Sequence, residues 1–310
     1  MKDKKSFWEK NIVVIVGALI CCFLWGSAFP FIKIGYRLLE IDSADTASQI
    51  LFGGVRFVIA GIMAVIIGSL IQKRIIYPHR DEFQRVAFIS LFQTIGQYIL
   101  FYIGMAHTSG VRGAIIEGSN VFVAIFVASL IFKQEKLTAR KVVGSIIGFA
   151  GVVVINVVGK SLGEGSVLTG DLMVFLSTFC YAFSSVLLKR YSAKSDTVMI
   201  SGYQFILGGL VMSAVGLFMG GSLRVNDGKS MAVLLYLAFI SAAAYSLWGI
   251  LLKYNPISKV AVIGFMNPVF GVILSTILLD EGQGLGVECL IALVLICIGI
   301  VIVNRETKEG

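Results

Sequence analysis

The sequence predicts an all-α integral membrane protein with about ten transmembrane helices, arranged as two inverted five-helix repeats. Three observations predict this fold class: the composition, the spacing of apolar runs and basic residues, and an internal repeat. Of the 310 residues, 57% are hydrophobic and only 14% are charged. Soluble domains average about 25% charged residues. A folded chain of this size still exposes about a quarter of the surface that it exposes when unfolded. Lipid is therefore the expected solvent, and the composition excludes a disordered chain, a nucleic-acid module and a secreted disulfide scaffold.

The apolar runs define the predicted spans, because a membrane helix needs about 20 mostly apolar residues. The first run has a basic start, like a signal peptide. Nine further runs follow it, and Ile20 before Cys21 does not fit a lipoprotein cleavage site, so we interpret it as the first helix. The predicted spans are 12–34, 49–71, 84–106, 113–132, 141–158, 170–189, 198–219, 231–252, 259–279 and 286–303.

The basic residues alternate with these spans. Nineteen of the 26 Lys and Arg residues fall on the side that holds both termini, six fall on the other side, and Arg56 lies within a span. Cytoplasmic loops of membrane proteins carry an excess of Lys and Arg. The pattern therefore predicts a multi-pass protein of the plasma membrane with both termini in the cytoplasm.

An internal repeat relates the two halves of the chain. At an offset of 147 residues Tyr98 meets Tyr245, and with small gaps the segment that starts at Trp25 matches the segment that starts at Tyr181. Because five spans is an odd number, the second half enters the membrane from the opposite side, which suits alternating access to a midplane site. The predicted organisation is a cytoplasmic N-terminus at 1–11, a first repeat at 12–158, a connecting loop at 159–169, a second repeat at 170–304 and a cytoplasmic C-terminus at 305–310.

Several short motifs resemble a known family. The segment WGSAF at 25–29, Arg56-Phe57, and MNPVF at 266–270 followed by Asp280-Glu281 resemble the drug/metabolite transporter superfamily of EamA type. The resemblance covers 12–303 and implies a ten-helix inner-membrane carrier, typically an exporter of amino acids or other small metabolites, with a central cavity between the halves.

One departure from the repeat concerns a proline. The second half has Asn267-Pro268-Val269 where the first half has Asn120-Val121-Phe122. A proline inside a helix removes a backbone hydrogen bond and kinks the helix. We therefore expect the first half to lack this kink, so that the two halves need not flex equally.

Glu117 is the first candidate for a substrate contact, because polar groups inside lipid are costly and are usually functional. It lies in the fourth span with Asn120 on the same helical face, and its repeat mate is Gly264. It can serve as a counter-charge for a cationic substrate or as a proton-coupling acid. The alternatives are a structural ion pair with Arg56 or Arg112, or a solvated site near the outer face.

Two stripes of polar and aromatic side chains are the next candidates, one on span three and one on span eight. Aromatic faces can hold organic cations, although such stripes also occur as packing or as interfacial belts. Repeat-equivalent segments of spans one and six add further candidates. The predicted substrate-binding residues are Trp25, Gln93, Gln97, Tyr98, Tyr102, Glu117, Asn120, Tyr181, Ser184, Tyr245, Trp248 and Asn267.

Other features favour structural roles. Arg56 is expected to be structural, and neither histidine has a metal partner at a useful spacing. Gly144 and Gly148 form a small-xxx-small pattern that lets helices approach closely. We expect that pattern to serve packing within the molecule, although a homodimer stays open.

The sequence thus predicts a secondary active transporter, not an enzyme. It would move a small organic metabolite (an amino acid, amine or quaternary cation) by alternating access, with efflux favoured and protons as a candidate coupling ion. No cofactor, metal site, catalytic residue or nucleic-acid partner is predicted, and Gly159-Lys160-Ser161 fails as a phosphate loop because Val154 replaces the required glycine. The alternatives are an importer of a cationic metabolite with the same fold, an integral-membrane lipid-modifying enzyme, and a membrane scaffold.

Overall fold

The computed structural model describes residues 7–133, 137–157, 165–192, 195–255, 263–264, 266–279 and 286–304, and every regular element among them is a helix. The termini 1–6 and 305–310, the start of the connecting loop with Gly159-Lys160-Ser161, and Asp280-Glu281 lie outside the described residues. The first half comprises η1 (Phe7–Glu9), α1 (Asn11–Leu38), α2 (Thr46–Gln72), α3 (Phe83–Ile89), η2 (Ser90–Gly96), α4 (Gln97–His107), α5 (Gly110–Glu117), α6 (Asn120–Phe126), η3 (Val127–Ile131) and α7 (Ala139–Val157). The second half comprises α8 (Gly165–Ser192), α9 (Thr197–Phe218), α10 (Gly228–Tyr254), α12 (Met266–Leu278) and α13 (Val287–Asn304).

The predicted spans correspond to these helices, so the all-helical membrane fold is confirmed. Seven helical stretches of the described chain are long and apolar enough to cross a membrane, and α12 and α13 contribute shorter apolar helices. Span three is the continuous stretch Phe83–His107, and span four is Gly110–Ile131.

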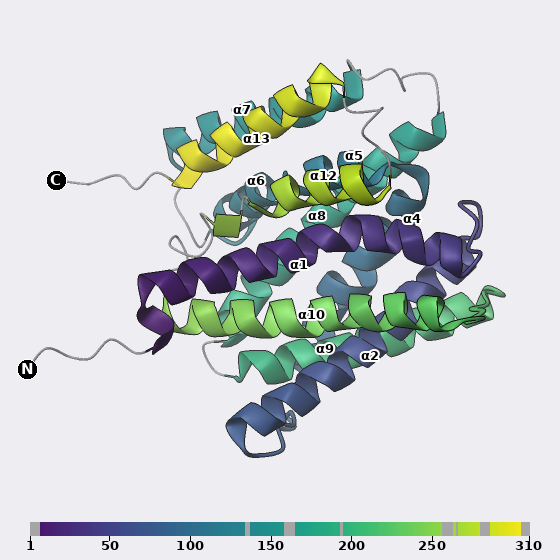
Figure 1. Ribbon diagram of the computed structural model, residues 1–310. Helices are drawn as coiled ribbons and strands as arrows, with labels where there is room; N and C mark the ends of the chain where they lie inside the picture. The colour runs from purple at the N-terminus through teal and green to yellow at the C-terminus, as the bar shows by residue number, and fades with distance from the viewer. Residues whose placement is uncertain are drawn as a thin grey trace, which may run out of the picture.

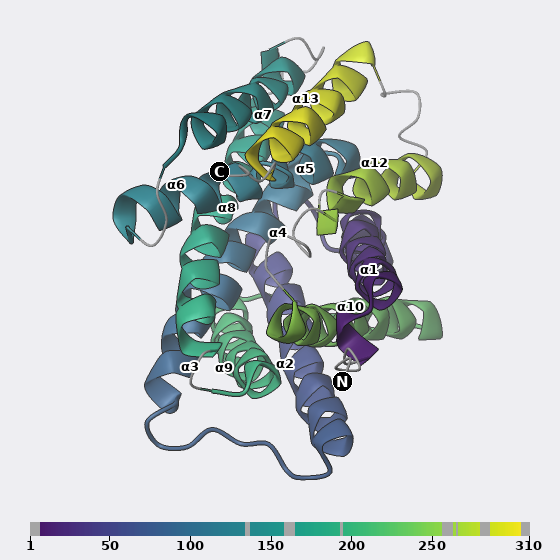
Figure 2. The same ribbon diagram turned by 90° about the vertical axis from the view of Figure 1, so that its left-hand side faces the viewer.

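The helices pack in an arrangement that repeats when the two halves are exchanged. α2 lies beside α9 and α7 lies beside α13 (Figures 1 and 2). α1 packs against α10 and α12, while α8 packs against α4 and against α5 and α6. These packing contacts of the first half thus have counterparts in the second, as expected for a pair of inverted repeats. α1 begins and α13 ends at the same, left-hand end of the bundle in Figure 1.

Glycine allows α2 and α9 to approach at the centre of this symmetry. A Cβ atom on Gly54 would lie 2.9 Å from the carbonyl oxygen of Gly209, and a Cβ atom on Gly209 would lie 2.7 Å from the carbonyl oxygen of Gly54. Real Cβ atoms do not tolerate such distances, so only glycine permits this backbone contact. α2 and α9, the second long helix of each half, therefore touch backbone to backbone.

The predicted small-residue pattern of α7 packs within the molecule. A Cβ atom on Gly299 of α13 would lie 2.5 Å from the carbonyl oxygen of Gly144 and 2.8 Å from the backbone nitrogen of Gly148. The pattern therefore serves the contact between α7 and α13.

The fourth span is irregular at a different position from the one that the missing proline concerns. The fourth span is interrupted between α5 and α6 although it contains no proline. At this point the backbone N–H of Ser119 donates to the carbonyl oxygen of Ile116 at 2.9 Å, an i to i−3 bond that tightens the helix. The turn at Gly118 and Ser119 thus breaks the helix directly after Glu117.

The first half also contains two π-helical turns, η2 and η3. The corresponding parts of α10 and α12 are α-helical throughout. Such turns insert an extra residue per helical turn and are frequent at functional sites.

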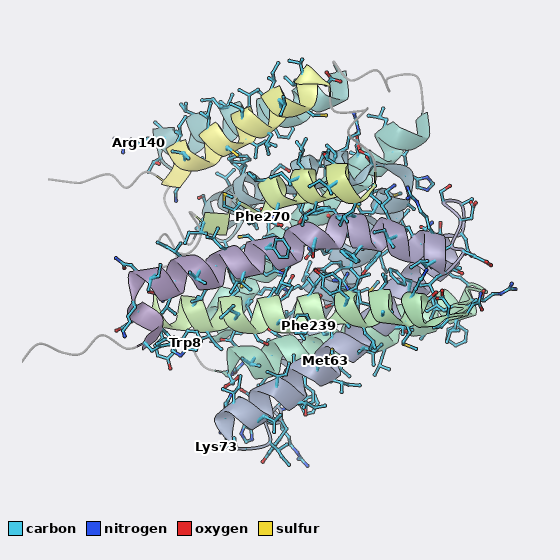
Figure 3. All side chains as sticks on the ribbon, in the orientation of Figure 1. Trp8, Met63, Lys73, Arg140, Phe239 and Phe270 are labelled. Atoms are coloured by element: carbon cyan, nitrogen blue, oxygen red, sulfur yellow. The ribbon has the colours of Figure 1, made fainter. Side chains whose placement is uncertain are left out.

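Basic side chains gather at the end where α1 begins. Figure 3 places Lys73 and Arg140 at the same end as Trp8, whereas Phe239 and Phe270 lie between the two ends. This distribution matches the charge asymmetry that the sequence predicts, and the cytoplasmic assignment of that end stays a prediction.

Candidate functional site

Two tyrosines meet between the halves. Tyr98 of α4 and Tyr245 of α10 place their hydroxyl oxygens 3.3 Å apart, and the two residues are 147 positions apart in the chain. They are repeat mates, so their contact lies on the pseudo-twofold axis. Both side chains are half-buried.

Two tryptophans extend this pair. The ring of Trp25 on α1 lies 5.4 Å from the ring of Tyr245 and 5.2 Å from the ring of Trp248, in edge-to-face arrangements. A Cβ atom on Gly264 would lie 3.4 Å from the Cη2 atom of Trp248, so Gly264 lies directly against the edge of that indole. We call Trp25, Tyr98, Tyr245 and Trp248 the aromatic cluster.

Glu117 lies beside the aromatic cluster at the end of α5. Its side chain is only 8% exposed, and its Oε1 atom accepts a long hydrogen bond of 3.4 Å from the side-chain amide of Asn120. Its Oε2 atom has no hydrogen-bond partner among the described residues. Glu117 is within electrostatic range of the hydroxyl groups of Tyr181 on α8 and Tyr245 on α10.

Three predicted carboxamides lie around the same helices. The Gln93 side chain interacts with the Tyr245 hydroxyl. Gln97 and Asn267 are carried by α4 and α12, and each has a buried side-chain oxygen without a partner in the described part of the chain. Gly118, next to Glu117, lies against Pro268, next to Asn267, because a Cβ atom on Gly118 would be 3.4 Å from the Pro268 ring.

Two predicted site residues have other roles in this structure. Tyr102 is fully buried, and its hydroxyl accepts a hydrogen bond from Arg56. Its ring lies 6.1 Å from the ring of Tyr98, on the same helical face, and is held in the core between α2, α4 and α10 by the bond from Arg56. The Ser184 hydroxyl donates to the backbone carbonyl of Tyr181 at 2.8 Å, so a bond within its own helix occupies it.

Arg56 connects three helices inside the bundle. Its side chain is 2% exposed, and its Nε atom donates to the Leu237 carbonyl at 2.9 Å. A second bond of 2.9 Å reaches the Ser241 hydroxyl, and a third reaches Tyr102. These neutral acceptors, and not Glu117, satisfy the guanidinium.

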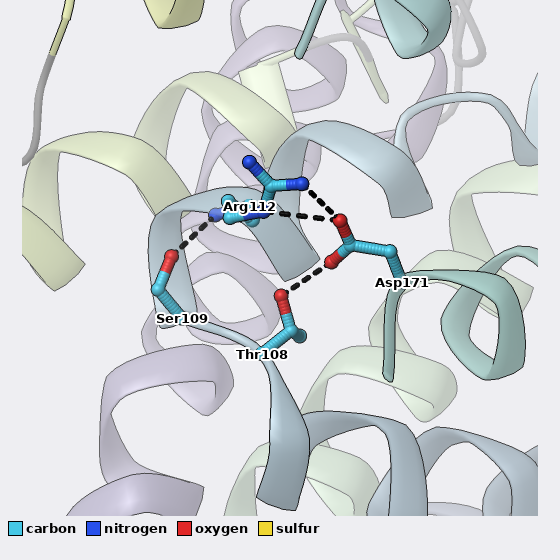
Figure 4. Close-up of polar contacts among 4 residues, drawn as sticks. All are labelled: Thr108, Ser109, Arg112 and Asp171. Atoms are coloured by element: carbon cyan, nitrogen blue, oxygen red, sulfur yellow. Dashed lines mark hydrogen bonds and ion pairs between the residues drawn. The ribbon is translucent and has the colours of Figure 1, made fainter. Parts of the chain in front are cut away.

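Arg112 is the other arginine that was considered for an ion pair with Glu117. It instead pairs with Asp171 at the start of α8 (Figure 4). Its Nε atom donates to a carboxylate oxygen of Asp171 at 3.0 Å, and the Thr108 hydroxyl donates to the other oxygen. The Ser109 side chain caps α5 by accepting from the backbone N–H of Arg112 at 3.1 Å. The sequence alone did not predict this cluster of Thr108, Ser109, Arg112 and Asp171. The opposite charges of Arg112 and Asp171, each near a span end on the same predicted side of the membrane, could have indicated the ion pair.

The fold and this polar interior define a polytopic α-helical membrane protein of the transporter class. A model of the EamA-like transporter family matches residues 12–157 and again residues 168–305. The chain therefore belongs to the EamA-like transporter family.

Individual proteins agree with this membership. An uncharacterized transporter of Archaeoglobus fulgidus is 30% identical over 296 residues, which cover 94% of this chain and 99% of that protein. The uncharacterized transporter YvbV of Bacillus subtilis is 27% identical over 301 residues, which cover 94% of this chain and 92% of that protein. A protein crystal structure shares the fold with a TM-score of 0.63 at 18% identity, covering 93% of this chain and 96% of that one.

Proposed function

We propose that this chain is a secondary active transporter that moves a small organic metabolite with a cationic group across the plasma membrane by alternating access, in the direction of efflux. The observation that carries the proposal is Glu117, a buried carboxylate with one oxygen lacking a partner in the described chain. Two half-buried tyrosines, Tyr181 and Tyr245, lie within its electrostatic range, and aromatic rings attract organic cations.

The electrostatics of the site support coupling to protons. A carboxylate buried between membrane helices is costly unless a positive charge accompanies it. Arg56 donates its hydrogen bonds to Tyr102, Ser241 and Leu237. Arg112 forms an ion pair with Asp171. A bound proton and a bound substrate cation can each neutralise Glu117, but not both together. The proposal therefore includes exchange of one cation for one proton.

The symmetry of the fold supports alternating access. α1 packs on α10 and α12 as α8 packs on α4, α5 and α6. Two arrangements related by exchanging the halves then have similar energy, which is the physical basis of opening a site to either side.

Binding measurements on Glu117→Gln test the proposed role of the carboxylate. We expect affinity for organic cations to fall about 30-fold or more, because losing one partner of a buried charged contact costs about 2–5 kcal/mol. Glu288→Gln, a neutralisation in the first turn of α13, is the matched control and should leave affinity unchanged. Equal affinity of the Glu117→Gln variant and the native protein for every cation that binds contradicts the role of Glu117.

Transport in proteoliposomes tests coupling and direction. A pH gradient should drive accumulation of the cation in the compartment from which protons leave. Transport that ignores the pH gradient removes the proton-coupling part of the proposal. Net uptake by cells that express the chain, in place of efflux, assigns it as an importer.

A further inference from the structure

The unpartnered oxygen of Glu117 restricts what the substrate head group can be. An ionised carboxylate only accepts hydrogen bonds. The one hydrogen bond to Glu117 from the described residues is the 3.4 Å contact with Asn120, and it reaches Oε1. Oε2 is buried and has no partner there. A cation that fits this oxygen must therefore donate a hydrogen.

Trp25, whose ring packs against Tyr245, adds the opposite requirement. Its Nε1 atom is buried and has no hydrogen-bond partner among the described residues, and an indole N–H only donates. The Trp25 ring is held against the rings of Tyr245 and Trp248, so the N–H is held with them. A ligand that satisfies both groups carries a donor and an acceptor.

The carboxamides leave this requirement unchanged. Gln97 and Asn267 each have an unpartnered side-chain oxygen among the described residues. A carboxamide that rotates by about 180° about its last side-chain bond presents its N–H₂ group instead. These side chains can therefore pair with either a donor or an acceptor of the ligand. Glu117 and Trp25 cannot adapt, so these two residues determine the chemistry.

We infer that the transported head group is a cation with N–H hydrogens, either a protonated primary or secondary amine or a guanidinium, with a hydroxyl or carbonyl oxygen nearby, and that quaternary ammonium compounds are disfavoured. This inference rests on the proposed function, since it selects among the cations that the transporter would carry. Aromatic faces attract methylated and N–H-bearing cations alike. The discrimination comes from Glu117, because a charge-assisted N–H bond is roughly twice as strong as a neutral one, whereas a quaternary ammonium leaves Oε2 unpaired.

The second half supplies no second carboxylate at the position equivalent to Glu117, so one positive charge on the ligand is enough to match the site. The repeat mate of Glu117 is Gly264, which carries no acceptor side chain. Its backbone lies beside the Trp248 ring. Where the first half has a carboxylate, the second half thus has a glycine that packs against an aromatic ring.

Paired ligands test the inference on the full chain in lipid nanodiscs. Titration calorimetry would compare ethanolamine with choline, and phenethylamine with its N,N,N-trimethyl derivative. Each amine should bind at least about 10-fold more tightly than its methylated partner, because a hydrogen bond to a charged group is lost on methylation. In Glu117→Gln this preference should fall below about 3-fold, while Glu288→Gln should keep it.

Trp25→Phe isolates the indole N–H while keeping an aromatic ring. This variant should weaken ethanolamine, which carries an oxygen, and leave phenethylamine unchanged. It remains informative if Glu117→Gln does not fold, and the paired comparison on the native chain decides the main point without any variant.

The outcomes separate this inference from the proposed function. If the quaternary member of each binding pair binds as tightly as its amine or more tightly, the inference is overturned, while transport of organic cations stands. If neither class binds and neither is transported, the proposed function fails and the inference fails with it.

Discussion

The two halves of the molecule are alike where they pack and unlike where they carry charge. Glycines of α2 and α9 face each other, Gly54 with Gly209 and Gly61 with Gly202. Glu117, in contrast, has Gly264 as its repeat mate. The comparison teaches that the frame depends on residues that both halves keep, while the polar interior depends on residues that one half alone has.

The largest expected effect tests the shared frame. Gly54→Val and Gly209→Val should each lower the free energy of unfolding by about 3 kcal/mol, because either side chain enters the backbone of the facing helix. Denaturation of the purified protein in lipid measures both losses. Gly228→Val is the control, since a Cβ atom there meets nothing within 4 Å. Losses no larger than that of Gly228→Val would contradict the close backbone contact between α2 and α9.

The second prediction tests the asymmetry at Arg56. Arg56→Met should cost about 2 kcal/mol, because it leaves the Ser241 hydroxyl and the Leu237 carbonyl without their donor, while relief of a buried charge offsets part of that loss. Val211→Met is the control, because it introduces the same side chain at a position of α9 that is 38% exposed, and it should have almost no effect. Thermal unfolding compares the two, and similar shifts would show that Arg56 has no special structural role.

The third prediction compares the two ends of the bundle. Thr108 and Asn255 are repeat mates; Thr108 donates to Asp171 at one end, while the Asn255 amide donates to the Trp8 carbonyl at 2.8 Å at the other. Asp171→Asn should cost about 1–2 kcal/mol by leaving the Arg112 charge less compensated. It should also speed labelling of a cysteine placed near Thr108.

Asn255→Ala is the comparison at the opposite end, and it changes no charge. The salt dependence of stability should therefore change in Asp171→Asn and not in Asn255→Ala. An equal salt response of both variants contradicts an ionic contribution at the end near Thr108.

The smallest effect concerns how the third helix of each half begins. Asp227 caps α10 by accepting from the backbone N–H of Ser230 at 2.7 Å, whereas Glu82 makes no such bond at the start of α3. Hydrogen bonds from the Ser230 side chain and backbone hold the pKa of Asp227 below its ordinary value of 3.8. A lowered folded pKa contributes stability that is present above the unfolded value and is lost as pH falls through the folded value.

Hydrogen exchange at the start of α10 measures this effect. Protection of the first turn should fall as the pH drops below 3.8, and it should fall less at the start of α3. Asp227→Asn keeps the cap and removes the charge, so its protection should no longer depend on pH in that range. A pH response that persists in Asp227→Asn assigns the effect to another group.

Much of the fold could be predicted because each span is a long apolar run with basic residues beyond one end. The 147-residue offset also predicted that Tyr98 and Tyr245 are equivalent, and the structure adds that they touch. The break at Gly118 and Ser119 was missed, because the sequence argument equated a broken helix with proline. The π-helical turns η2 and η3 depend on tertiary packing and leave no local signal.

The candidate site divides in the same way. Glu117 could be found because a lone carboxylate in an apolar span is conspicuous. Tyr102 could not be separated from Tyr98, since both lie on one helix and the choice between core and site depends on the position of Arg56 in space. The pairing of Arg112 with Asp171 joins residues from different halves, and no spacing rule connects them.

The contact between Tyr98 and Tyr245 has a consequence for counting charges. In a symmetric dimer of identical halves every residue occurs twice, so a cavity on the axis holds an even number of carboxylates. Joining both halves in one chain frees each copy to differ, and here one copy has Glu117 and the other Gly264. The site can therefore hold a single carboxylate although the helices around it are related by a pseudo-twofold axis. A dimer of identical subunits would place two carboxylates there.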